Sequence, residues 1–263
     1  QPRAQQERRE EQGGAVHPSR RFVLVAGAAL FLPALLLGTW LSLDQGALER
    51  SASPKVRQIY VQDLFEQYYS DRPPLLFFTQ VTTNNIRVSF QAYGLGAVSG
   101  GLGAIYVLAV NGANVGEVAA WMHEAGDLPR FLGFIVPHGA LELSAIAIAA
   151  AAGMAVGWAL VAPGDRRRSE ALREEGQRSV TVVLGLMTMF VAAGLIEGFI
   201  TGRGLPPVAR VGVGLVLWVA YVGYLVTRGR AAADQGVTGL LGEQPRAWED
   251  EPDRWAAVRP AGG

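Results

Sequence analysis

Long apolar stretches alternate with polar segments along this chain, and their length is the main structural signal. A helix that spans a bilayer needs about 20 predominantly apolar residues. The stretches that reach this length are 22–43, 88–110, 131–161, 180–202 and 207–227. Aromatic residues lie near several of their ends, where interfacial side chains are expected. The pattern therefore predicts an all-α protein, a polytopic transmembrane helix bundle whose surroundings are the lipid bilayer.

The polar segments divide the chain into five parts. Residues 1–19 and 229–263 are polar and low in large apolar side chains, so we expect two disordered tails. The first transmembrane helix occupies 20–43. We interpret it as a retained anchor, although "SRRFVL" resembles an export signal, because its apolar core exceeds the usual 7–15 residues. Residues 44–85 form a connector with an amphipathic helix, and 86–228 form the transmembrane core.

The basic residues conflict with five crossings. The segment up to Arg21 contains five arginines, the loop 163–179 contains five more, and Arg228 and Arg230 follow the last apolar stretch. The positive-inside rule places all three in the cytoplasm, which requires an even number of crossings. The stretch 88–161 is long enough for three helices at 1.5 Å per residue. We therefore predict five to six membrane segments, with six and both ends cytoplasmic preferred.

The sequence "FIVPHGALELSAI" places polar and helix-breaking residues inside an apolar stretch. Pro137 lacks a backbone N–H group and disfavours helical geometry in the residue before it. Gly139 adds backbone freedom. We therefore expect one membrane segment to be broken or re-entrant around Pro137–Gly139, with a short half-helix before it and a second helix running to about residue 161.

Ionisable residues occur at expected membrane depth. His138 and Glu142 are four residues apart and share one helix face, and Glu197 is a second buried acid. Three interpretations remain open: a structural pairing at the helix break, a proton or ion pathway, and a catalytic metal site. Catalytic zinc usually has three protein ligands, and "HGALE" supplies two, with His123 and Glu124 as the nearest supplements. We therefore predict no bound metal and no cofactor.

Composition narrows the function classes. The 23 basic and 23 acidic residues balance, so the chain lacks the basic surface of a nucleic-acid-binding protein. There is no cysteine, which excludes disulfides and thiolate chemistry. No HExxH, GxSxG or GxxxxGK motif occurs. We therefore expect a protein that is not an enzyme.

The region from residue 84 to 157 resembles a known family. The residues that carry the resemblance are Asn84, Asn85, Asn111, Gly112 and Gly116, followed by the PHG sequence at 137–139 and by Glu142. In this order and spacing, the sequence is similar to the stage II sporulation protein M family of bacterial membrane proteins. The resemblance implies a polytopic protein of the bacterial inner membrane. The namesake of the family anchors cell-wall hydrolases during engulfment of the forespore, a role that the resemblance does not carry over to this chain.

Three functions follow from these observations. We expect first a non-enzymatic scaffold or assembly subunit of a membrane complex, which binds other membrane proteins or a second copy of itself. The alternative is a transporter or channel-like protein that uses His138, Glu142 and Glu197. An intramembrane hydrolase is a weaker alternative. Small residues four apart, such as Gly112 and Gly116, are expected to pack helices within one bundle.

Overall fold

The structure is a computed structural model that describes residues 17–65, 73–197, 199, 205–240 and 243. Of the tails predicted for 1–19 and 229–263, residues 1–16, 241–242 and 244–263 lie outside the described residues, whereas 17–19 belong to the first helix. Within the described part of the chain every regular element is helical, which confirms the all-α bundle. Six helices are long. They are α2 (His17–Leu43), α6 (Pro74–Val98), α7 (Leu102–Glu124), α8 (Leu128–Val161), α9 (Arg168–Ile196) and α10 (Pro207–Asp234).

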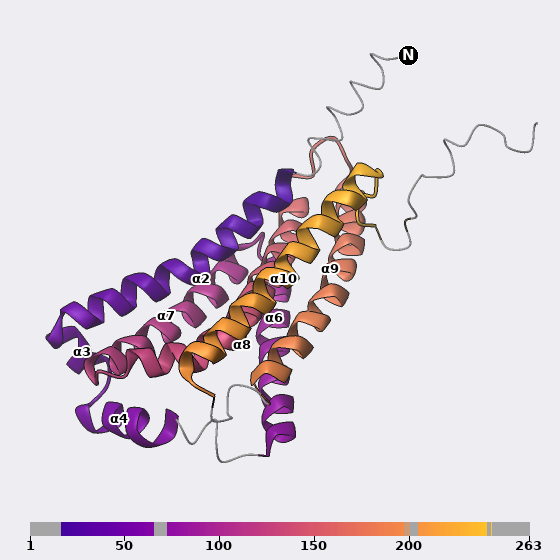
Figure 1. Ribbon diagram of the computed structural model, residues 1–263. Coiled ribbons are helices and arrows are strands. Elements are labelled where there is room, and N and C mark those ends of the chain that lie inside the picture. Colours follow the sequence, from indigo (N-terminus) through magenta and orange to yellow (C-terminus); the bar gives the residue numbers. More distant parts are fainter. Residues whose placement is uncertain (1–16, 66–72, 198, 200–204, 241–242, 244–263) are drawn as a thin grey trace, which may run out of the picture.

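Five of these helices, α2 and α7 to α10, are long and apolar enough to cross a membrane. This agreement of length and composition confirms a multi-pass membrane protein. The sixth, α6, has 25 residues and mixes polar side chains into its sequence. It lies alongside the others as part of the same bundle (Figure 1). The described residues therefore form a bundle of six long helices, of which five have the composition of membrane spans.

The predicted segment 88–110 is wrong, because the chain reverses direction inside it. α6 ends at Val98 and α7 begins at Leu102. The turn between them uses Gly100 and Gly101 with φ of 66° and 104°, a backbone region that favours glycine. The Gly101 N–H donates to the Gly96 carbonyl at 2.8 Å, which closes the end of α6. Apolar composition alone does not show such a reversal.

The predicted break around Pro137–Gly139 is also wrong. α8 is continuous from Leu128 to Val161, with Pro137 inside it. A proline is tolerated within a membrane helix where neighbouring groups satisfy the backbone groups that it frees. Here α10 lies directly against the backbone of Pro137, and a Cβ atom at Gly214 would collide with the Pro137 Cα and carbonyl atoms. This tight contact holds α8 at its proline.

Glycines bring other helices into backbone contact. A side chain at Gly112 would collide with the Leu30 carbonyl of α2, and one at Gly116 would collide with the Ala34 carbonyl. α6 and α8 approach in the same way at Gly157. The small residues spaced by four therefore pack helices within one bundle, as predicted.

The connector is shorter than predicted. Within the described residues, α2 is followed by α3 (Gln45–Ser51), α4 (Pro54–Ile59) and the π-helix η1 (Tyr60–Leu64). The side chains of Asp44 and Ser53 cap α3 and α4 by accepting backbone hydrogen bonds. Residues 74–85, which we assigned to the connector, belong to α6. At the other end of the chain, α10 continues to Asp234, beyond the predicted boundary at 228.

The bundle has two distinct ends. The start of α2, the α6–α7 turn, the α8–α9 loop and the end of α10 lie at one end, which we call the terminal end (Figure 1). α3, α4 and the start of α10 lie at the other (Figure 1). A hydrogen bond from Arg178 Nε to the Thr238 carbonyl, 3.2 Å, ties α9 to the segment after α10 at the terminal end. The arginine-rich loop and both described ends of the chain therefore share one side of the bundle.

Candidate functional site

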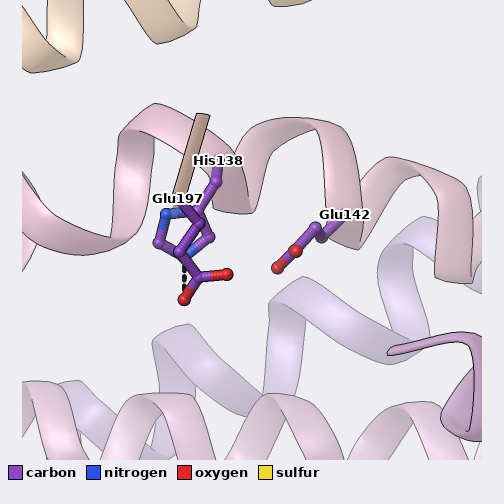
Figure 2. Close-up of side chains that lie close together, drawn as sticks. All are labelled: His138, Glu142 and Glu197. Carbon is purple, nitrogen blue, oxygen red and sulfur yellow. Dashed lines mark ion pairs between the residues drawn. The ribbon is translucent and has the colours of Figure 1, made fainter. Parts of the chain in front are cut away.

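Three ionisable side chains meet inside the bundle. His138 and Glu142 lie four residues apart on α8, and Glu197 follows directly after the last residue of α9. His138 Nε2 is 3.5 Å from Glu197 Oε1. One nitrogen or oxygen atom from each of the three residues lies within 4.8 Å of the others. Figure 2 shows the Glu142 carboxyl group directed toward that of Glu197, with the imidazole beside it.

These side chains are buried. His138 is 4% exposed, Glu142 7% and Glu197 2%. The removal of a charged group from water costs several kcal/mol unless a partner compensates for it. Glu142 Oε1 and Glu197 Oε2 have no hydrogen-bond partner among the described residues. Two acids placed together in an apolar interior therefore need a counter-charge or protons.

A third helix supplies polar groups to this region. The Asn85 side chain of α6 is a hydrogen-bond partner of the Glu142 carboxyl group. Thr82 and Ser89 are buried, and they lie three and four residues from Asn85, on the same side of α6. Neither hydroxyl has a hydrogen-bond partner within the described part of the chain. α6 thus presents a polar face to the bundle interior, which explains why it is less apolar than its neighbours.

The sequence identified the members of this cluster but not their pairing. It placed His138 beside Glu142, whereas the close polar contact in the structure is between His138 and Glu197. It also named His123 and Glu124 as the nearest additional ligands. Glu124 instead contacts Arg57, and His123 is exposed at the end of α7. The third member, Glu197, lies at the end of α9. It reaches the cluster because α9 runs back along α8 and ends beside His138.

The other residues of the sequence motif have separate places. Asn84 is exposed on α6. Asn111 lies within α7 and donates to the Val107 carbonyl at 2.7 Å, one turn earlier in its own helix. Gly112 and Gly116 form the contact with α2. Among the described motif residues that lie outside α8, Asn85 is the one that reaches the ionisable cluster.

Sequence reasoning missed a second polar centre at the end of the bundle opposite the terminal end. Arg57 is buried, and its Nε and Nη2 atoms donate to Glu124 at 2.9 and 3.2 Å. Its Nη1 atom donates to the carbonyls of Leu48 and Ala52 at 2.9 and 2.7 Å. A helical periodicity assigns Arg57 to the polar, exposed face of its helix. Because Glu124 is far away in the sequence, no local pattern shows this contact.

A third buried polar centre lies on α10, at Arg210. The guanidinium group of Arg210 stacks over the Phe134 ring, 4.3 Å from its centroid. Such a contact is attractive because the ring face carries partial negative charge. Arg210 lies one helical turn before Gly214, the residue that contacts Pro137. The start of α10 is therefore fixed to α8 by both stacking and close backbone packing.

The comparisons with known proteins agree with this architecture. The model of the family described as stage II sporulation protein M matches residues 27–202. The chain belongs to this family. The matched region begins in α2, ends just after α9, and contains the whole ionisable cluster.

The chain is similar to an uncharacterised protein from Methanocaldococcus jannaschii. It is 29% identical over 128 residues, which cover 48% of this chain and 71% of the relative. No solved structure matches the chain. Family membership thus agrees with the multi-pass membrane fold. It assigns no chemical role to the residues of the ionisable cluster.

Proposed function

We propose that this protein is a non-enzymatic scaffold, a subunit that assembles with other proteins of the bacterial inner membrane. The observation that carries the proposal is the contact of buried Arg57 with Glu124 and two backbone carbonyls. It fixes a folded segment outside the long helices. We call this segment, residues 45–65, the cap.

The cap is joined to the bundle by apolar contacts as well. The Tyr60 ring meets the Trp121 ring edge-on, with centroids 5.6 Å apart, and Phe65 meets Phe134 at 5.5 Å. The Trp121 indole N–H donates to the Ser51 hydroxyl at 3.0 Å. These contacts hold the cap in one arrangement before a partner binds. A preorganised surface loses less conformational entropy on association than a flexible one.

The outer side of the cap carries apolar side chains. Val56 is 52% exposed and Ile59 is 39% exposed, three residues apart on α4. They share one face of the helix, next to the exposed Lys55. An apolar pair with a neighbouring positive charge suits a partner that offers an apolar groove with an acidic rim. We infer that a membrane protein which extends beyond the bilayer binds here.

Purification from native membranes in a mild detergent tests the proposal. The same protein is expected to co-purify in stoichiometric amount with the wild-type chain and with Gln58→Asn, an uncharged control on the same short helix. The double variant Val56→Glu and Ile59→Glu should lose that protein while keeping the thermal stability of the wild type. If the double variant retains the co-purifying protein, the proposal that this protein binds through the cap is wrong. A chain that purifies alone contradicts the scaffold itself.

A second candidate function is ion translocation, favoured by the buried positions of His138, Glu142 and Glu197. Ionisable groups within membrane segments commonly belong to ion or proton pathways. The Glu142→Gln variant separates the two functions. A scaffold keeps its partners in this variant, and reconstituted liposomes show the same ion flux as the wild type. A folded variant that keeps every partner but loses a measured flux supports translocation.

A further inference from the structure

We propose that His138, Glu142 and Glu197 bind one divalent transition-metal ion, with Zn²⁺ as the expected ion. This binding site is independent of the scaffold function. It rests on the separation of the three side chains, on their combined charge and on the groups that surround them.

The separation of the ligand atoms suits a small metal ion. Zinc bonds to histidine nitrogen and carboxylate oxygen are about 2.0–2.2 Å long. In a tetrahedron, bonds of that length place two ligand atoms about 3.3–3.6 Å apart. His138 Nε2 and Glu197 Oε1 are 3.5 Å apart, and one atom of Glu142 lies within 4.8 Å of the others. Three-ligand coordination requires the Glu142 oxygen to move closer to the other two ligand atoms than this upper limit.

The charges also suit a divalent cation. Two carboxylates carry two negative charges, and neutral imidazole adds none. A divalent ion therefore makes the centre electrically neutral, which matters where each side chain is at most 7% exposed. The Glu142 Oε1 and Glu197 Oε2 atoms lack a hydrogen-bond partner among the described residues, so their lone pairs are available. Without a cation, the two adjacent carboxyl groups must either take up a proton or repel each other across the contact of α9 with α8.

Surrounding groups resemble the outer shell of a metal site. Ligating carboxylates are usually held by a hydrogen bond from a further residue, which fixes their direction. Asn85 of α6 provides that contact to Glu142. The metal would thus connect α8 and α9 directly, and α6 through the asparagine. Three helices that are distant in sequence would then be held at one point.

The donor set favours zinc over the alkaline-earth ions. Imidazole nitrogen suits Zn²⁺ and related transition metals, whereas Mg²⁺ and Ca²⁺ prefer sites made of oxygen alone. Mn²⁺ tolerates a carboxylate-rich site and is the main competitor. Three protein ligands leave one tetrahedral position for water.

Metal analysis of the full chain tests the proposal. The protein is purified in detergent with an affinity tag that contains no histidine, treated with a chelator, and then incubated with Zn²⁺ and dialysed. We expect about one zinc per wild-type chain by elemental mass spectrometry. Glu142→Gln and Glu197→Gln should each reduce that content at least tenfold. His123→Asn, which removes an exposed histidine at the end of α7, should retain it.

Two further measurements use the wild-type chain, in case a variant does not fold. Co²⁺ bound in place of zinc should produce visible absorption bands of four-coordinate geometry, and added Zn²⁺ should remove them. A parallel titration with Mn²⁺ measures the competing ion. The proposed site is wrong if the wild type binds no more zinc than the Glu142→Gln variant, or if His123→Asn abolishes zinc binding. Binding of Mn²⁺ at least tenfold tighter than Zn²⁺ overturns the assignment of zinc.

Discussion

His138 Nε2 lies 3.5 Å from Glu197 Oε1, and this contact joins the first half of α8 to the end of α9. Its two side chains are among the most buried polar groups that the structure describes. In an apolar interior, such a contact requires a compensating charge or hydrogen bond for each group. The balance of charge at this point therefore contributes to how firmly α9 is held against α8, beside the apolar contacts of the two helices.

The first prediction concerns thermal stability with zinc. A ligand that binds only the folded state at 100 times its Kd stabilises a protein by about 2.7 kcal/mol. For a chain of this size, that corresponds to a rise in Tm of about 5–10 °C. We expect this rise in the wild-type protein in detergent, measured by scanning fluorimetry with and without Zn²⁺.

The Glu197→Gln variant should respond differently. Because it lacks one carboxylate, its metal-free form loses the repulsion with Glu142 and should be at least as stable as the metal-free wild type. Addition of Zn²⁺ should leave its Tm unchanged within about 1 °C. An equal zinc-dependent rise in both proteins would place the stabilising metal somewhere else.

The second prediction concerns the α2–α7 contact. Gly112→Ala introduces a Cβ atom that collides with the Leu30 carbonyl, so the two helices must separate. Overpacking of this kind usually costs about 1–3 kcal/mol. Gly27→Ala in α2 is the matched control, because nothing lies within 4 Å of a Cβ atom there. Alanine is up to about 1 kcal/mol better than glycine within a helix, so the control should be neutral or stabilising. Denaturation in mixed micelles measures both changes, and equal effects would contradict the close contact.

The sequence predicted the helical class and most membrane segments because apolar length is a local property. Five of the long helices satisfy the same criterion in the structure. It did not predict the reversal between Val98 and Leu102, because glycines inside an apolar stretch serve equally as packing positions and as turns. It also predicted a break at Pro137 that the structure does not contain. At that proline, α8 packs closely against Gly214 of α10, which is far away in sequence.

The candidate site was predictable in its members but not in its geometry. Ionisable residues are rare in apolar stretches, so His138, Glu142 and Glu197 could be selected directly from the sequence. Their meeting depends on how α9 returns along α8, which is a tertiary property. The polar face of α6 could have been found from the spacing of Thr82, Asn85 and Ser89, since three and four residues separate positions on one helix side. Arg57 offered no comparable signal.

The third prediction concerns the cap. Arg57→Met removes the guanidinium group that binds Glu124 and two carbonyls, and it leaves those acceptors without their donor. Loss of one partner of a fully buried ion pair costs about 3–5 kcal/mol. Because the Glu124 side chain is 35% exposed, we discount that figure to about 1–3 kcal/mol. Faster limited proteolysis within residues 45–65 checks this expectation. Lys55→Met removes an exposed charge from the same helix and should not change the rate.

The final prediction is the number of crossings, which depends on α6. The chain has no cysteine, so single introduced cysteines report their side of the membrane without background. If α6 crosses, Gln58 of the cap and Ala125 between α7 and α8 lie on one side, while Ser99 and Ser169 lie on the other. If α6 does not cross, Gln58 and Ala125 lie on opposite sides. Labelling with a membrane-impermeant thiol reagent, in intact cells and in inverted vesicles, distinguishes these arrangements.

We expect six crossings, with Ser169 and Ser99 labelled in inverted vesicles and Gln58 and Ala125 labelled in intact cells. The bundle places the arginine-rich loop around Ser169 at the same end as the start of α2 and the end of α10 (Figure 1). The positive-inside rule then puts that end in the cytoplasm. The cap and its apolar pair would face the opposite side, where a partner must present its own binding surface. Labelling of the Gln58→Cys variant only in inverted vesicles would reverse this orientation and place the partner in the cytoplasm.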